Sequence, residues 1–136
     1  MSEKENNTES ESISSEPVLY KVKIGIAYIT LNTKMNTINM DTARKIVQLL
    51  TEADKNPKVK VVVLNSIGDR VFSAGFDLAM FQQGFSDKIL DDLLLYGRDI
   101  SRAIYFLKKP VISQIHVIAP QRSNSSKNTF LPITRD

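Results

Sequence analysis

The sequence predicts an α/β fold, and three features of the amino-acid pattern support this prediction. Short apolar runs with strand-like spacing alternate with two longer segments in which apolar residues recur at helical spacing. Residues 59–65 are apolar on both faces, as in a strand buried within a parallel sheet. The chain has 136 residues, 42% of them hydrophobic, which is enough for one modest domain.

Composition divides the chain into three segments. Residues 1–17 carry five Glu and one Lys and are otherwise mostly polar, so we expect a disordered acidic tail that cannot bury enough apolar surface to fold. Residues 18–119 contain the expected helices and strands and form the domain. Residues 120–136 have no Gly, no Glu and no helical periodicity, so we expect a divergent, disordered C-terminal tail.

Four main strands are expected. Residues 18–31 alternate between apolar and polar side chains and are interrupted at Ile24-Gly25, which predicts two strands joined by a tight turn. Residues 59–65 form the third strand. Residues 111–118 form the fourth, directly after Lys109-Pro110.

Two helices are expected between these strands. The first begins at a cap, either Asn39 or Asp41, and ends at Asn56. The second covers residues 87–108 and can bend or break at Gly97, because Gly costs roughly 1 kcal/mol relative to Ala in a helix. The apolar stripe of the first helix comprises Ala43, Ile46, Val47, Leu50 and Ala53, and that of the second comprises Leu90, Leu93, Leu94, Ile100, Ala103, Ile104 and Leu107.

Residues 70–78, Arg-Val-Phe-Ser-Ala-Gly-Phe-Asp-Leu, connect the buried strand at 59–65 to a short helix. Small residues let a backbone approach a ligand closely, and amides before a helix start point outward, toward a negative atom if one is present. That arrangement describes half of an oxyanion hole. The alternative is a strand-to-helix turn in which Asp77 serves as the N-cap.

The segment Phe-Ser-Ala-Gly-Phe-Asp-Leu at residues 72–78 resembles the signature of the enoyl-CoA hydratase/isomerase (crotonase) family. Two further segments agree in the family's order. Residues 29–39 resemble its first strand and Asn-Ala-Leu segment, and residues 109–116 resemble its Lys-Pro-Val-Ile strand. The resemblance implies a partial crotonase-like domain over residues 18–119, built as an incomplete right-handed spiral of ββα units.

The resemblance also implies roles for individual residues. In this family the amide of the residue after the signature glycine forms half of an oxyanion hole, so the backbone amide of Phe76 would polarise an acyl-CoA thioester. Ala74, with Gly75 beside it, would lie near the adenine end of the bent coenzyme A. Lys34 would meet the ADP part of coenzyme A and Arg70 would pair with one of its phosphates, and the alternative for both is a solvated loop residue. No separate cofactor is implied, because coenzyme A is part of the substrate.

The resemblance stops before the family's second oxyanion loop and before the glutamates used for acid/base work. Val117 stands where the family has Gly, and no carboxylate in the matched region stands in for those glutamates. We therefore expect a chain that is truncated relative to the family and that binds acyl-CoA but is inactive alone. The alternative is a non-catalytic interaction or regulatory fragment that forms a homo- or hetero-oligomer with a full-length homologue.

Charge and composition narrow the range of partners and locations. The net charge of +3 combines −4 in residues 1–17 with +7 in the remainder, so the body of the chain could attract phosphates. The positive charges are scattered and aromatic residues make up only 7%, which argues against nucleic acid. No apolar run reaches the roughly 18 residues of a membrane span, and the absence of cysteine excludes thiolate metal sites. We expect an intracellular location, cytoplasmic by default, since neither a presequence nor a Ser-Lys-Leu-type tripeptide is recognisable.

Overall fold

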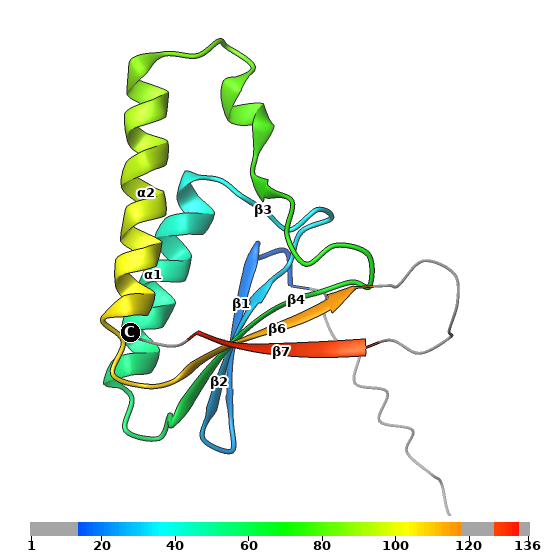
Figure 1. The fold of residues 1–136 in the computed structure, drawn as a ribbon, viewed down its shortest axis with the longest axis vertical. Helices are drawn as coiled ribbons and strands as arrows, with labels where there is room; N and C mark the ends of the chain where they lie inside the picture. Colours follow the sequence, from blue (N-terminus) through cyan, green and yellow to red (C-terminus); the bar gives the residue numbers. More distant parts are fainter. Residues whose placement is uncertain (1–13, 118–126, 134–136) are drawn as a thin grey trace, which may run out of the picture.

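Five strands form one mixed sheet in a computed structural model that describes residues 14–117 and 127–133. The strand order is β1-β2-β4-β6-β7. The three central strands run parallel, and the outer strands run antiparallel to their neighbours. The helices α1 (Met40–Lys55) and α2 (Asp87–Tyr105) lie on the same side of this sheet (Figure 1), which confirms the predicted α/β class. The strands are β1 (Val18–Lys23), β2 (Ile26–Leu31), β4 (Val61–Ser66), β6 (Val111–Val117) and β7 (Lys127–Ile133).

A two-residue turn joins β1 to β2, as the sequence predicts. Lys23 pairs with Ile26 at the end of the hairpin. The two turn residues both have positive φ, 49° at Ile24 and 76° at Gly25. Such turns match the right-handed twist of the flanking strands and favour Asn-Gly, so a β-branched Ile in the first position is strained.

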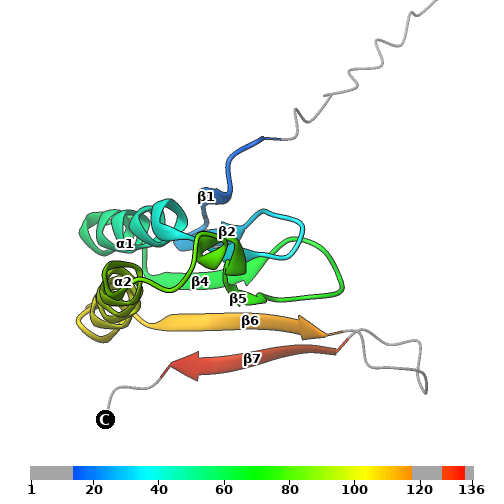
Figure 2. The same ribbon diagram turned by 90° about the horizontal axis from the view of Figure 1, so that it is seen from above.

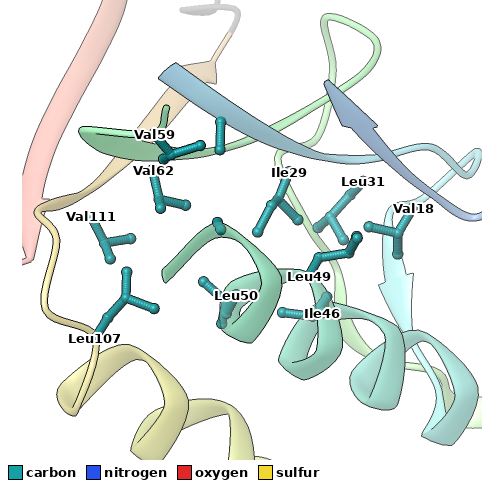
Figure 3. Packing of buried hydrophobic residues seen from close by; sticks show 12 residues of the cluster. Val18, Ile29, Leu31, Ile46, Leu49, Leu50, Val59, Val62, Leu107 and Val111 are labelled. Atoms are coloured by element: carbon teal, nitrogen blue, oxygen red, sulfur yellow. The ribbon is translucent and has the colours of Figure 1, made fainter. Parts of the chain in front are cut away.

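The hydrophobic core lies between the sheet and α1 (Figure 3). Of the two predicted caps, Asn39 and Asp41, the N-cap of α1 is Asn39, whose Oδ1 accepts a hydrogen bond from the Thr42 N–H at 2.8 Å. Each fully buried large aliphatic side chain contributes about 1.5–3 kcal/mol. The buried cluster comprises Val18, Ala27, Ile29, Leu31, Ile46, Leu49, Leu50, Ala53, Val59, Val62, Leu107 and Val111.

The C-terminal end of α1 is held by the segment that leads into β6. The Lys109 ammonium donates to the carbonyl of Ala53 at 2.6 Å and to that of Asn56 at 2.5 Å. The Lys108 N–H donates to Asp54 Oδ1 at 2.9 Å. The last carbonyls of a helix have no partner within the helix, and a cation there also opposes the negative end of the helix dipole.

The second helix differs from its prediction in two respects. It continues through Gly97 without a break and ends at Tyr105 rather than at residue 108. Leu90 and Leu94, expected on the buried face, are 44% and 63% exposed. The physical reason is that α2 packs against α1 (Figure 2), and α1 covers a narrower stripe of α2 than the apolar periodicity of the sequence predicts. Within the described part of the chain, no helix combines the length and apolar character needed to cross a bilayer.

Parts of both expected tails lie within the described residues. Asn32 donates from its backbone to Pro17 O and from its side chain to Ser14 O and Glu16 O, at 2.8–3.0 Å, so residues 14–17 are attached to the domain. The rest of the N-terminal tail, 1–13, lies outside the described residues.

At the other end, residues 127–133 form β7, antiparallel to β6, where we expected a disordered tail. Pairing with β7 covers the backbone groups of β6 that would otherwise form an open sheet edge. Pro132 is tolerated because β7 is itself an edge strand. Residues 118–126 and 134–136 of the expected tail lie outside the described residues.

Candidate functional site

A second, two-stranded sheet holds the segment that the sequence singles out. In it β3 (Thr37–Ile38) runs parallel to β5 (Gly75–Phe76), with Thr37 opposite Gly75 and Ile38 opposite Phe76. The Asp77 N–H donates to Ile38 O at 3.0 Å. The loop after β2 and the signature segment, distant in sequence, therefore lie side by side.

The Phe76 amide points away from β3. Consecutive residues of a strand direct their N–H groups to opposite sides, and the Asp77 N–H is directed at β3, so the Phe76 N–H is directed the other way. Gly75 precedes it with φ +81°, and a Cβ added there would meet no atom within 4 Å. The glycine is thus required by its left-handed backbone conformation and not by crowding.

Asn36 joins the two loops beside this sheet. It is 1% exposed and has a left-handed backbone with φ 49°. Its side-chain amide donates to Ile67 O at 3.1 Å and to Val71 O at 3.0 Å, and its Oδ1 accepts from the Thr33 N–H at 3.1 Å. The sequence identifies Asn36 only as part of a resembling segment. The sequence feature that could have pointed to Asn36 is its residue type, because Asn is among the few residues that readily adopt a left-handed backbone conformation.

Ser73 adds a second connection that sequence reasoning missed. Its hydroxyl donates to Asn36 O at 2.7 Å and accepts from the Gly75 N–H at 3.1 Å. The Ala74 N–H donates to Met35 O at 3.1 Å. The signature segment is therefore bound to the loop after β2 through both backbone and side chain.

The other predicted site residues lie on these same two loops. Lys34 is exposed on the loop after β2, and Arg70 is exposed on the loop after β4. Ala74 and Gly75 are exposed as well, so a ligand can reach their backbone. The structure thus brings the loops of the two predicted cationic residues together, and both side chains face solvent.

Asp77 has the capping role that the sequence predicts. Its Oδ1 accepts from the Ala79 N–H at 2.9 Å and begins the short 3-10 helix η1 (Leu78–Phe81). The carboxylate nearest to Phe76 in sequence is therefore engaged by the start of this helix.

An apolar cavity of about 120 Å³ lies next to the signature segment, between the sheet and the helices. Phe81 and Tyr96 do not line this cavity: Phe81 stacks on Phe85 with ring centroids 4.5 Å apart, and the Tyr96 hydroxyl contacts Arg44. Met80 does not line the cavity either. The cavity is lined by Ile29, Leu31, Ile38, Ile46, Leu64, Asn65, Phe72, Ser73 and Ile100.

Comparison with known proteins gives consistent results. The family described as enoyl-CoA hydratase/isomerase matches residues 21–120. Crotonyl-CoA hydratase of Syntrophomonas wolfei is 31% identical over 97 residues, which cover 71% of this chain and 37% of that protein. The mitochondrial 3-hydroxyisobutyryl-CoA hydrolase of Bos taurus is 30% identical over 105 residues, covering 74% of this chain and 27% of that protein.

A solved structure with a similar fold has the same description as the matching family. The crystal structure of an enoyl-CoA hydratase/isomerase from Xanthobacter autotrophicus matches with a TM-score of 0.67 and 26% identity, covering 75% of this chain and 39% of that chain. The present chain therefore spans between 27% and 39% of the length of these three proteins.

Proposed function

Because this chain belongs to the enoyl-CoA hydratase/isomerase family, we propose that it binds an acyl-CoA thioester and polarises the thioester carbonyl with the Phe76 amide. The observation that carries this proposal is the direction of the Phe76 N–H, away from β3 and beside the exposed backbone of Gly75. A carbonyl oxygen gains negative charge as it is polarised, and a donor already held in place stabilises that charge without reorganising. One such donor typically contributes about 10² to 10³ in rate.

The coenzyme A part of the ligand would be held by the two loops around this amide. Lys34 and Arg70 supply positive charge from both loops, and phosphates are anions that Lys and Arg both bind. Ala74 and Gly75 are exposed beside this amide, and their own N–H groups are held within the protein by Met35 O and Ser73 Oγ. This proposal uses each of the residues that the resemblance identifies.

We also propose that the chain binds acyl-CoA without converting it. Hydration requires an activated water and a proton for the α-carbon, in addition to carbonyl polarisation. Asp77 is occupied with capping η1, and Asp69 is exposed on a loop, so neither is arranged as a general base. The described residues near Phe76 thus support binding and polarisation rather than a complete reaction.

Calorimetric titration of the full chain with crotonyl-CoA tests binding. We expect a saturable heat that is lost in Phe76→Pro, which removes the N–H, and retained in Phe76→Ala, which removes only the ring. Circular dichroism of both variants controls for folding. A folded wild-type chain that gives no heat with crotonyl-CoA contradicts the proposal, as does equal binding by the Pro variant. If crotonyl-CoA steadily loses its enoyl absorbance in the presence of this chain alone, the chain converts its ligand, and the proposal of binding without conversion is contradicted.

A second candidate function is association with another crotonase-like chain in a non-catalytic role. The observation that favours it is a set of large apolar side chains that remain exposed: Leu78 at 77%, Phe85 at 79% and Leu94 at 63%. Exposed apolar side chains mark an interaction site where they form one contiguous patch. Light scattering over a range of concentrations tests it: a monomer throughout, alone and mixed with a full-length family member, excludes this function.

A further inference from the structure

We infer that Asn36 and Ser73 are positioning residues that set the direction of the Phe76 N–H, and that thioester polarisation depends on them. This inference rests on the proposed function and goes beyond it, since neither side chain is expected to touch the ligand. Asn36 is buried, and the Ser73 hydroxyl is occupied by Asn36 O and by the Gly75 N–H. Their effect would reach the ligand only through the backbone of β5.

The Asn36 side chain holds the turn between β4 and the signature segment. Both donor hydrogens of the Asn36 amide are used, on Ile67 O at 3.1 Å and on Val71 O at 3.0 Å. These carbonyls stand at the two ends of an exposed turn that contains Gly68, with φ +82°. The Asn36 side chain therefore closes this turn from inside the protein and determines where the chain leaves it.

Ser73, two residues after Val71, makes a further contact with Asn36. The Ser73 hydroxyl donates to Asn36 O at 2.7 Å, so the same asparagine holds the segment at residue 71 through its side chain and at residue 73 through its carbonyl. The hydroxyl oxygen also accepts from the Gly75 N–H at 3.1 Å. One serine thus fixes the peptide group that immediately precedes Gly75.

The peptide between Gly75 and Phe76 lies within β5. A glycine tolerates many backbone conformations, so Gly75 itself does little to fix the direction of the next N–H. The pairing of β5 with β3, which includes the bond from the Asp77 N–H to Ile38 O, supplies one restraint, and the bond from the Gly75 N–H to Ser73 Oγ adds another. Removing the serine hydroxyl releases the restraint on the Gly75 N–H and leaves the exposed loop residues in place.

We expect a change at Ser73 to reduce polarisation of the bound thioester without reducing its binding affinity. The loops that carry Lys34 and Arg70 keep their charges when Ser73 is changed, so binding of the coenzyme A part is retained. The Phe76 N–H is held less firmly in its direction, and a hydrogen bond weakens steeply when its angle departs from linearity. A purely structural role for Ser73 would instead change stability and leave the polarisation of a bound thioester unaltered.

The experiment measures the absorption spectrum of cinnamoyl-CoA bound to the full chain, alongside its affinity by calorimetry. Polarising the carbonyl of a conjugated thioester shifts its absorption to longer wavelength. We expect a red shift with the wild type, a smaller shift in Ser73→Ala at similar affinity, and recovery in Ser73→Thr, which restores the hydroxyl. Ser101→Ala is the matched control, because it deletes an exposed hydroxyl that donates to Gly97 O within α2, at 2.9 Å.

Asn36→Asp is the second variant, since it keeps the volume and the Oδ1 acceptor but replaces the donors that face two carbonyls. Thermal unfolding is measured for each variant, and the spectra are recorded below the lowest transition. A wild-type shift that Ser73→Ala and Asn36→Asp both retain in full overturns the inference and leaves the proposed function standing. A folded wild type that binds cinnamoyl-CoA without any shift, or does not bind it, overturns both.

Discussion

The ring of Phe76 packs against α2 at Gly97: a Cβ atom added to this glycine would lie 3.7 Å from Phe76 Cζ. This is ordinary van der Waals contact, so the site segment and the middle of α2 are in contact without being crowded. The glycine is therefore not required for space at the level of one methyl group.

Replacing Gly97 with Ala should accordingly stabilise the protein. The gain comes from helix propensity and from a less flexible unfolded chain, and we expect about 0.5–1 kcal/mol in the free energy of unfolding. Urea denaturation measures it. Gly97→Leu provides the contrast, because its longer side chain would displace the Phe76 ring. If the Ala variant is the less stable protein, the helix needs Gly97 for a reason that the contact distance does not show.

The hairpin turn predicts a second stabilising change. Ile24 is 90% exposed and has φ 49°, so it makes few contacts and carries the strain of a β-branched residue in a left-handed conformation. Ile24→Asn should raise the free energy of unfolding by about 1 kcal/mol, since Asn adopts this conformation readily. Ile24→Val, which keeps the β-branch, should leave it nearly unchanged. Equal melting temperatures for the Asn and Val variants would contradict the argument.

These two positions also show how far the sequence predicts the fold. Alternation on either side of Ile24-Gly25 and the apolar run at 59–65 are local patterns, and the hairpin and β4 follow from them. Gly97 is a poor helix former, yet α2 continues through it because tertiary packing outweighs a penalty of roughly 1 kcal/mol. Periodicity also cannot show how much of an apolar face a neighbour covers, which is why the pattern predicts a buried Leu94 where the structure exposes it.

The site was predicted less completely. The resemblance points to Phe76, whose role stays a prediction, and local rules identified Asp77 as a cap, because both inferences depend on residues close in sequence. The contacts from Asn36 to the carbonyls of Ile67 and Val71 join residues 31 and 35 positions apart. No local pattern encodes such contacts, so the connection between the two loops had to be seen in three dimensions.

Lys109 provides a prediction with a closely matched control. Lys109→Met keeps the aliphatic stem and removes the charged donor from the carbonyls of Ala53 and Asn56, so we expect a loss of about 1.5–3 kcal/mol in the free energy of unfolding. The side chain of the neighbouring Lys108 is exposed, and only its backbone N–H bonds to Asp54. Lys108→Met should therefore stay within about 0.5 kcal/mol of wild type. Similar losses in both variants would mean that general charge, not capping, is responsible.

Tyr20 predicts how stability responds to alkaline pH. Burial, and secondarily the charge of Glu52, raises the pKa of Tyr20 above its ordinary value of 10.0. A raised pKa in the folded state means that stability is intact below the unfolded-state pKa and falls as the pH rises through the folded-state pKa. Tyr20→Phe should flatten the decline in unfolding free energy between about pH 9 and 12.

The same change should not weaken the protein at neutral pH. The Tyr20 hydroxyl is buried and has no hydrogen-bond partner within the described part of the chain, so its removal breaks no bond there. Tyr105→Phe is the control, because Tyr105 is 55% exposed and should leave the alkaline profile unchanged. An alkaline decline that is as steep in the Tyr20→Phe variant as in wild type would show that other groups cause it.

The last prediction concerns the two exposed basic residues at the proposed coenzyme A site. Arg70→Ala and Lys34→Ala should each weaken binding of crotonyl-CoA by about two- to fivefold, the modest effect typical of solvent-exposed charge pairs. The effect should shrink as salt is added, because the screening length falls from about 10 Å at 0.1 M to about 3 Å at 1 M.

Two controls separate phosphate contacts from a general effect of positive charge. The first is crotonyl-pantetheine, which carries the thioester but lacks the nucleotide, and its affinity should be the same for wild type and for both variants. The second is Lys88→Ala, an exposed lysine in the first turn of α2, which should leave binding of crotonyl-CoA unchanged. If Lys88→Ala weakens binding as much as Arg70→Ala, the attraction comes from the overall basic surface, and the two loops hold no phosphate site.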